Sequence, residues 1–205
     1  MSLTSRLLVL TAGAILFLAG TYFRYPRILD ELVQMADSSA ISSVPIEVTL
    51  SSDTTASSNL GKATIRVTLT NTSPHSISVL QWLSPLDTRA VAIGAFAFTS
   101  TRTNSLAPCL NLKLNRKLPE SGSFPADANE IIRIPPKGTV EKEVEAKEPD
   151  VALTKGERYR VVAQGQWMRV WIHSGEIDQP EKLSLEDGIS GEYKSNELEI
   201  EIEGS

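Results

Sequence analysis

The residues from which catalytic and metal sites are built are scarce in this sequence. Its 205 residues include one cysteine and two histidines. Protein zinc sites usually combine two or more cysteines or histidines at close spacing, and the HExxH motif is absent. The GxSxG, phosphate-loop and dinucleotide-binding motifs are absent as well. The sequence therefore predicts no catalytic residue, no metal ligand and no cofactor, and we expect a protein that is not an enzyme.

The lone cysteine also excludes an intrachain disulfide, so stability must come from packing. As a nucleophile, Cys109 would need His75 or His173 as its base. Because Cys109 follows Pro108 at the entrance of a predicted strand, a small buried thiol is the favoured interpretation.

A strong positive charge is lacking too. The formal net charge is −5, whereas a nucleic-acid surface usually carries a basic stripe. We therefore predict no nucleic-acid partner and expect another protein instead. The adjacent acidic pairs Asp30-Glu31 and Glu186-Asp187 are interpreted as solvated charges, because neither lies beside a histidine or an apolar run that would shift a carboxylate pKa.

One long uncharged run is present, at residues 7–23, with arginines on both sides. Its length lies between that of a signal-peptide core and that of a membrane-spanning helix. Residues 1–27 are therefore predicted to be a signal peptide or a signal-anchor helix, with cleavage and anchoring both open. We expect entry to the secretory pathway and a location outside the cell or anchored in a membrane, with 7–23 as the membrane contact. Residues 28–43 follow as a short helix and linker.

From residue 44 to residue 205 the sequence predicts a β domain. Apolar side chains alternate with polar ones over 63–70, residues 71–74 supply turn chemistry, and a second alternating run covers 77–82; together they predict a hairpin. About eight or nine strands without a helix predict an all-β antiparallel sandwich. The other predicted strands are 46–50, 91–100, 110–114, 131–134, 140–145, 157–173 and 198–202, with loops at 51–62, 117–129 and 174–195.

Some side chains on these strands invite a functional interpretation. The pattern of 157–173 shifts after Trp167, which predicts a bulge. Trp82, Trp167 and Trp171 fall in apolar strand patterns, so packing is favoured over a ligand groove. The alternate glutamates of the last strand are typical of a solvated edge that discourages aggregation. Those glutamates are Glu197, Glu199, Glu201 and Glu203.

One modification site is predicted. Asn71-Thr72-Ser73 is an N-glycosylation sequon in a predicted turn, which makes Asn71 the candidate acceptor in a lumen-facing domain. Pro74 directly after the sequon is expected to lower its use.

Several short motifs occur in a fixed order along the predicted β domain. They are VTLTNT at 67–72, VL at 79–80, SPLD at 84–87, IPPKG at 134–138, GERYRV at 156–161, and SN at 195–196 leading to IEG at 202–204. Together they resemble the pro-region of fungal deuterolysin-type metallopeptidases. The resemblance spans roughly residues 46–204 and implies an immunoglobulin-like sandwich in the secretory pathway. In that family a zinc protease domain with HExxH follows, and no position here matches its metal ligands or catalytic glutamate.

The resemblance implies a non-enzymatic, protein-binding module whose candidate partner is a secreted protease, which it would inhibit or help to fold. Two alternatives stay open. One is an unrecognised enzyme that uses Cys109 with a histidine. The other is a carbohydrate-binding domain with a groove lined by tryptophans.

Overall fold

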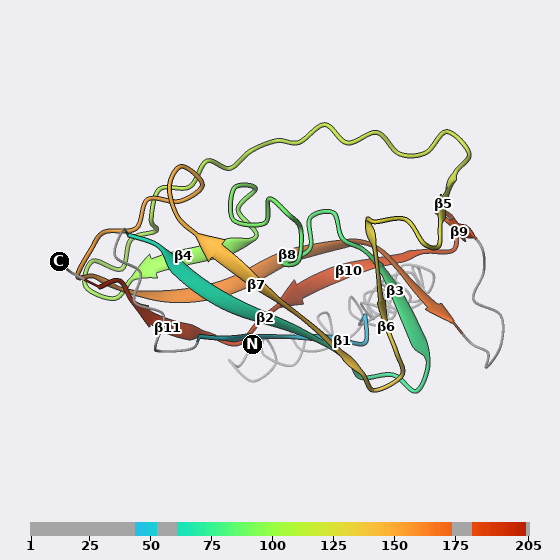
Figure 1. The fold of residues 1–205 in the computed structure, drawn as a ribbon, viewed down its shortest axis with the longest axis horizontal. Coiled ribbons are helices and arrows are strands. Elements are labelled where there is room, and N and C mark those ends of the chain that lie inside the picture. Colours follow the sequence, from blue (N-terminus) through green and yellow to red (C-terminus); the bar gives the residue numbers. More distant parts are fainter. Residues whose placement is uncertain (1–43, 53–60, 174–181, 204–205) are drawn as a thin grey trace, which may run out of the picture. The chain divides into compact units, whose positions relative to one another are not determined.

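The computed structural model describes residues 44–52, 61–173 and 182–203. The predicted leader or anchor at 1–27 and the helix and linker at 28–43 lie outside these residues, so the boundary at residue 44 stays a prediction. Within the described part, no helix is long and apolar enough to cross a membrane. The regular elements there are all strands (Figure 1), which confirms the all-β prediction.

The strands agree with most of the ranges expected from alternation. They are β1 (Ile46–Ser51), β2 (Ala63–Asn71), β3 (Ser76–Leu80), β4 (Phe96–Ser100), β5 (Ser123–Pro125), β6 (Ile131–Ile134), β7 (Thr139–Ala146), β8 (Arg158–His173), β9 (Lys182–Ser184), β10 (Ile189–Lys194) and β11 (Leu198–Glu201).

The first layer is the antiparallel sheet β1-β2-β7. In β2, Ile65, Val67 and Leu69 are fully buried, and the polar residues between them are half-exposed. This is the two-residue period expected of a strand with one face on a core. In β7, Val144 is buried while Glu143 and its alternate neighbours are exposed, as the sequence predicts.

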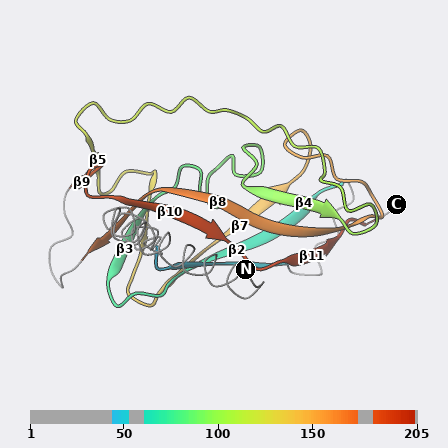
Figure 2. The same ribbon diagram turned by 180° about the vertical axis from the view of Figure 1, so that it is seen from behind.

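The second layer is built around β8, the longest strand. Its first half pairs with β4 and β11, and its second half pairs with β3 and β10. Figure 2 shows β8 and β10 from the opposite side. From Trp167 to Val170, β8 advances by three residues, while β10 advances by two, between Gly191 and Ile189. This register shift confirms the predicted irregularity after Trp167.

The expected hairpin of 63–70 and 77–82 is wrong. β2 pairs with β1 and β7, whereas β3 pairs with β6 and β8 in the other sheet. The turn after β2 therefore carries the chain across the sandwich instead of reversing it within one sheet. β3 is buried on both faces from Ile77 to Leu80, since a second small cluster covers its outer side.

Two other strand predictions need correction. Of 91–100, the first part forms turns and strand β4 begins at Phe96. The run 110–114 forms no strand, and Leu110 and Leu114 are exposed. The predicted loops 117–129 and 174–195 contain the short strands β5, β9 and β10, of which β5 pairs with β9.

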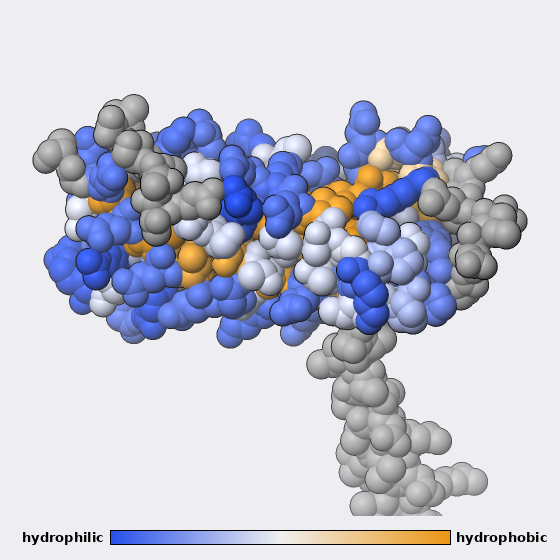
Figure 3. All heavy atoms as spheres, turned by 60° about the horizontal axis from the view of Figure 1, so that its bottom comes forward, coloured by the Kyte–Doolittle hydropathy of each residue, from blue (hydrophilic) through white to orange (hydrophobic). Residues whose placement is uncertain are grey.

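The main core lies between the two layers. Buried side chains of β1, β2 and β7 contact those of β3, β4, β8 and β11 in one cluster. The second cluster contains Leu80, Phe124, Ala126, Trp171 and Leu183. It places the β5–β9 ribbon against one end of β3 and β8. On the face shown in Figure 3, hydrophilic side chains predominate and apolar groups show between them.

Candidate functional site

A long extended connection between β4 and β5 carries the most unusual surface of the domain. Residues 106–119, named the strap here, have no regular secondary structure apart from isolated bridges at Leu106 and Cys109. The strap is the yellow-green chain that runs along one side of the molecule in both views (Figures 1 and 2).

The first half of the strap is fixed by hydrogen bonds to neighbouring turns and to strand β4. The Leu112 N–H donates to the Ala92 carbonyl at 2.8 Å, and the Cys109 thiol donates to the Val91 carbonyl at 3.1 Å. The backbone is therefore attached at successive points, although it has no partner strand along most of its length. Further attachments are Ala107 N to Phe98 O (2.8 Å), Leu110 N to Asp150 O (3.2 Å) and Ala152 N to Pro108 O (3.0 Å).

The second half is fixed by one buried ion pair. Arg116 of the strap donates two hydrogen bonds, at 2.7 and 2.8 Å, to the carboxylate of Asp87, whose side chain is 1% exposed. The backbone N–H groups of Leu83 and Arg89 donate to the same carboxylate, each at 2.9 Å. The Arg116 guanidinium also lies 5.4 Å from the ring centroid of Trp82. Asp87 thereby joins the strap to the turns that follow β3.

Electrostatics agree with a charged, paired Asp87. Burial raises the pKa of this carboxyl, but the hydrogen bonds from Arg116 and from the Arg89 and Leu83 amides outweigh burial and leave the pKa below its ordinary value. An Asp87 ionised at neutral pH is a structural anchor, since all its described partners are donors within the same domain.

The strap exposes four leucines, of which Leu110 and Leu114 lie between its anchors, Leu106 precedes Ala107 and Leu118 follows Arg116. Leu106, Leu110, Leu114 and Leu118 are 67%, 45%, 40% and 42% exposed. Single exposed apolar residues are ordinary, whereas a row of them along one segment is the most apolar feature of this surface and makes the strap the candidate site.

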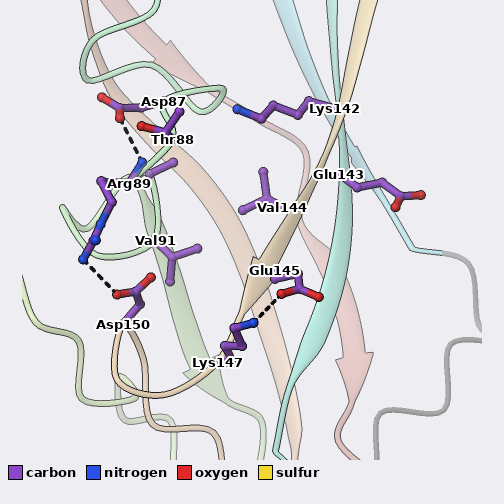
Figure 4. A pocket seen from close by; sticks show the side chains of 11 residues that line it. Asp87, Thr88, Arg89, Val91, Lys142, Glu143, Val144, Glu145, Lys147 and Asp150 are labelled. Atoms are coloured by element: carbon purple, nitrogen blue, oxygen red, sulfur yellow. Dashed lines mark hydrogen bonds and ion pairs between the residues drawn. The ribbon is translucent and has the colours of Figure 1, made fainter.

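An open hollow of about 220 Å³ lies between β7 and the turns after Asp87 (Figure 4). Its charges are neutralised by neighbours: Arg89 pairs with Asp150 at 3.4 Å, and Lys147 pairs with Glu145 at 2.5 Å. Hydrogen bonds from Lys147 and Lys62 lower the pKa of Glu145 to about 2. Lys142, which also lines the hollow, donates to the Leu86 carbonyl at 3.0 Å. Most charges of the hollow are therefore paired within the domain, and nothing about their arrangement points to a particular ligand.

Asn71, the predicted glycosylation site, is fully buried. Its amide nitrogen donates to the carbonyls of His75 (2.7 Å), Ile134 (3.2 Å) and Pro135 (2.9 Å), and its side-chain oxygen accepts from the Ser73 N–H at 2.9 Å. A glycan on that nitrogen would displace these bonds, so the folded structure disfavours modification. In this structure Asn71 fixes the crossing from one sheet to the other, and its use as an acceptor stays a prediction.

The structure joins neither histidine to the thiol by a hydrogen bond. Cys109 bonds to a turn carbonyl, His75 is exposed, and the His173 Nε2 lies 2.8 Å from the Ser78 hydroxyl. Burial, with the Arg133 charge, keeps the pKa of His173 below its ordinary value. In the described ranges no group of three or more His, Cys, Asp or Glu side chains is arranged to hold a metal ion.

The tryptophans lie in different environments. Trp167 is in the main core, with its ring centroid 4.7 Å from that of Tyr193, and Trp171 is buried in the second cluster. Trp82 is half-buried and makes an edge contact with Phe124 at 5.5 Å. Two of the three side chains therefore serve packing, as their apolar strand patterns predict.

Sequence reasoning missed the residues that define the strap. The leucines at 110, 112 and 114 read as a strand, and Arg116 gave no signal because its partner Asp87 is 29 residues away. The SPLD motif at 84–87 is the local signal that points to this anchor, since it contains Asp87, the partner of Arg116.

Comparison with known proteins decides the family. The pattern of the immunoglobulin-like domain family matches residues 46–202. This chain belongs to the immunoglobulin-like domain family. An uncharacterized secreted protein of Arthroderma benhamiae is 26% identical to it over 139 residues, which are 66% of this chain and 67% of that protein. Neither match is to a deuterolysin pro-region. The immunoglobulin-like domain thus has a relative described as secreted.

Proposed function

We propose that this chain is a secreted, non-enzymatic, protein-binding domain that resembles a metallopeptidase pro-region. The observation that carries the proposal is the strap, which holds exposed leucines on an immunoglobulin-like scaffold. Preorganised apolar side chains lose little conformational entropy when a partner covers them. The SPLD motif, which belongs to the resemblance, anchors this same surface through Asp87.

Secretion is proposed on two grounds. The relative from Arthroderma benhamiae is described as secreted, and residues 7–23 form the uncharged run expected of a signal peptide or anchor. N-terminal sequencing of the mature protein tests cleavage, and alkaline carbonate extraction tests anchoring. A cytosolic product that begins at Met1 would contradict the proposal.

Titration of the purified mature protein into a deuterolysin-type metallopeptidase tests the proposed partner. We expect a stoichiometric complex by calorimetry and inhibition of proteolysis. The double variant Leu114→Asp and Leu118→Asp should bind more weakly, while Ile172→Asp, an exposed apolar position on β8, should bind like the native protein. If neither a complex nor inhibition is found with the native protein, the protease partner is refuted.

A further inference from the structure

We infer that the strap binds an apolar groove with an acidic rim on a protein partner. The inference rests on the proposed protein-binding function and names the chemistry of the partner. Leu110, Leu114 and Leu118 would fill the groove, and Lys113 and Lys117 would contact its rim.

The apolar half of the inference follows from how the strap is held. The Leu112 N–H and the Arg116 side chain donate hydrogen bonds to the body of the domain. The side chains of Leu110, Leu114 and Leu118, each two residues from one of these anchors, are at least 40% exposed. Those leucines are exposed, and the backbone around Leu110 and Leu114 is held by anchors on both sides. A groove that covers them removes apolar surface from water without having to order a flexible loop.

The charged half follows from an uneven distribution of charge. The chain as a whole has a net charge of −5, but the stretch from Thr101 to Glu120 contains four basic residues and one acidic residue. Arg116 is neutralised by Asp87, and Arg102 pairs with Glu157 at 3.2 Å. The cations left for a partner are therefore lysines.

Two lysines lie beside the exposed leucines. Lys113 makes no ion pair with any residue that the structure describes. Lys117 pairs with Glu120 at 2.5 Å, but both side chains are at least 80% exposed, and such pairs contribute little. Acidic groups on a partner would complement both lysines, which favours specificity and faster association.

A protein groove fits this surface better than a membrane does. Peripheral membrane binding usually relies on clusters of about four to eight basic residues, or on aromatic anchors at the interface. The strap has no aromatic residue between Leu106 and Pro119, and only two of its cations are available. A narrow line of leucines on an extended backbone matches a groove that accepts an extended segment.

The test uses a phage library of one small folded domain whose groove-lining positions are randomised. The library is selected on the mature protein, expressed from the full-length gene. Selected grooves should be enriched in Asp or Glu together with Leu, Ile or Val. One selected domain should bind Leu114→Asp and Lys113→Glu at least about tenfold more weakly than the native protein. Ile172→Asp and Lys155→Glu, which change exposed positions outside the strap, are the matched controls and should retain binding.

Two results would overturn the inference. The first is selection of domains without acidic enrichment, or of domains that bind the Leu114→Asp variant as well as the native protein. The second is binding to vesicles of equal phosphatidylcholine and phosphatidylserine that Lys113→Glu abolishes, since this would assign the strap to a membrane.

The protease titration separates this inference from the proposed partner. If the protease binds the native protein and the Leu114→Asp variant equally, the strap is refuted as the binding surface, while the proposed protein-binding function stands. If the selected domains behave as expected and no protease binds, the strap stands as the binding surface and the protease partner fails.

Discussion

Asp87 shows how a single side chain fixes a distant segment. Its carboxylate is almost fully buried and accepts four hydrogen bonds, two of them from Arg116. Removing one partner of a buried ion pair usually costs about 3 to 5 kcal/mol, because the other charge is left without compensation. The strap thus depends on one residue pair for the position of its second half.

We expect Asp87→Asn to lower the free energy of unfolding by about 3 kcal/mol. Urea denaturation of the variant measures this effect. Asp150→Asn is the control, since its ion pair with Arg89 is partly exposed on both sides and should be worth less than about 1 kcal/mol. Equal losses in the two variants would refute the anchoring role of Asp87.

The lowered pKa of His173 predicts that the stability of the domain depends on pH. Burial and the Arg133 charge hold the pKa of its ring below the ordinary value of 6.5. The unfolded chain therefore binds the proton more readily, and stability is greatest above pH 6.5 and falls as the pH drops towards the folded-state pKa. Denaturation between about pH 7 and pH 5 should show a shallower decline for His173→Gln. The control His75→Gln changes an exposed ring and should keep the native decline; a His173→Gln profile identical to the native one would contradict the prediction.

At the scale of elements, the turns before β4 pack closely against the strap at Gly94. Its φ is +82°, and a Cβ there would lie 2.5 Å from the side-chain oxygen of Asn111. We expect Gly94→Ala to destabilise the domain by about 2 kcal/mol. Gly122→Ala is the control, because Gly122 has a φ of +70° but no atom within 4 Å of that Cβ, so its cost should be about 1 kcal/mol. Thermal unfolding compares them; a Gly94 variant as stable as the Gly122 variant would show that the contact is unimportant.

Two runs with the same alternation reveal what the sequence predicts and what it does not. Leu198, Ile200 and Ile202 form a strand and its continuation because β8 provides a free edge for β11. Leu110 and Leu114 alternate in the same way, yet the backbone there bonds to turns around Ala92 and Asp150. Alternation predicts which faces are apolar, but the presence of a neighbouring strand comes from the tertiary structure. The strap could therefore not be predicted as an exposed surface.

The same limit explains the wrong hairpin. Asn71 and the residues after it have ordinary turn chemistry, and nothing local distinguishes a reversal from a crossing. The distinction comes from Ile134 and Pro135, whose carbonyls accept hydrogen bonds from the Asn71 amide. Strands with one buried face, such as β2 and β7, were predicted well because burial alone fixes their pattern.

At the scale of the whole molecule, β11 is a strand whose pairing within the described residues is with β8. Glu199 and Glu201 of β11, and Glu197 and Glu203 beside it, are exposed, and Glu199 and Glu201 pair with Arg158. Like charges on such a strand oppose its pairing with a second molecule. This agrees with the interpretation of the glutamate row as a protective feature.

We expect the double variant Glu199→Val and Glu201→Val to self-associate at concentrations where the native protein is monodisperse. Size-exclusion chromatography with light scattering measures this. Glu186→Val with Asp187→Val, a pair in the exposed turn after β9, removes the same charge and is the control. Association in the control alone, or in neither variant, would contradict the edge role.

The strap contains no strand of either sheet, and this has a consequence for a chain cut within it. A single tryptic cleavage after Lys113 would leave β1 to β4 in one fragment and β5 to β11 in the other. The pairings β2 with β7, β3 with β8 and β4 with β8 all join the two fragments. A nicked molecule should therefore stay together as a folded two-piece complex in native chromatography, and separate into its halves only in denaturant.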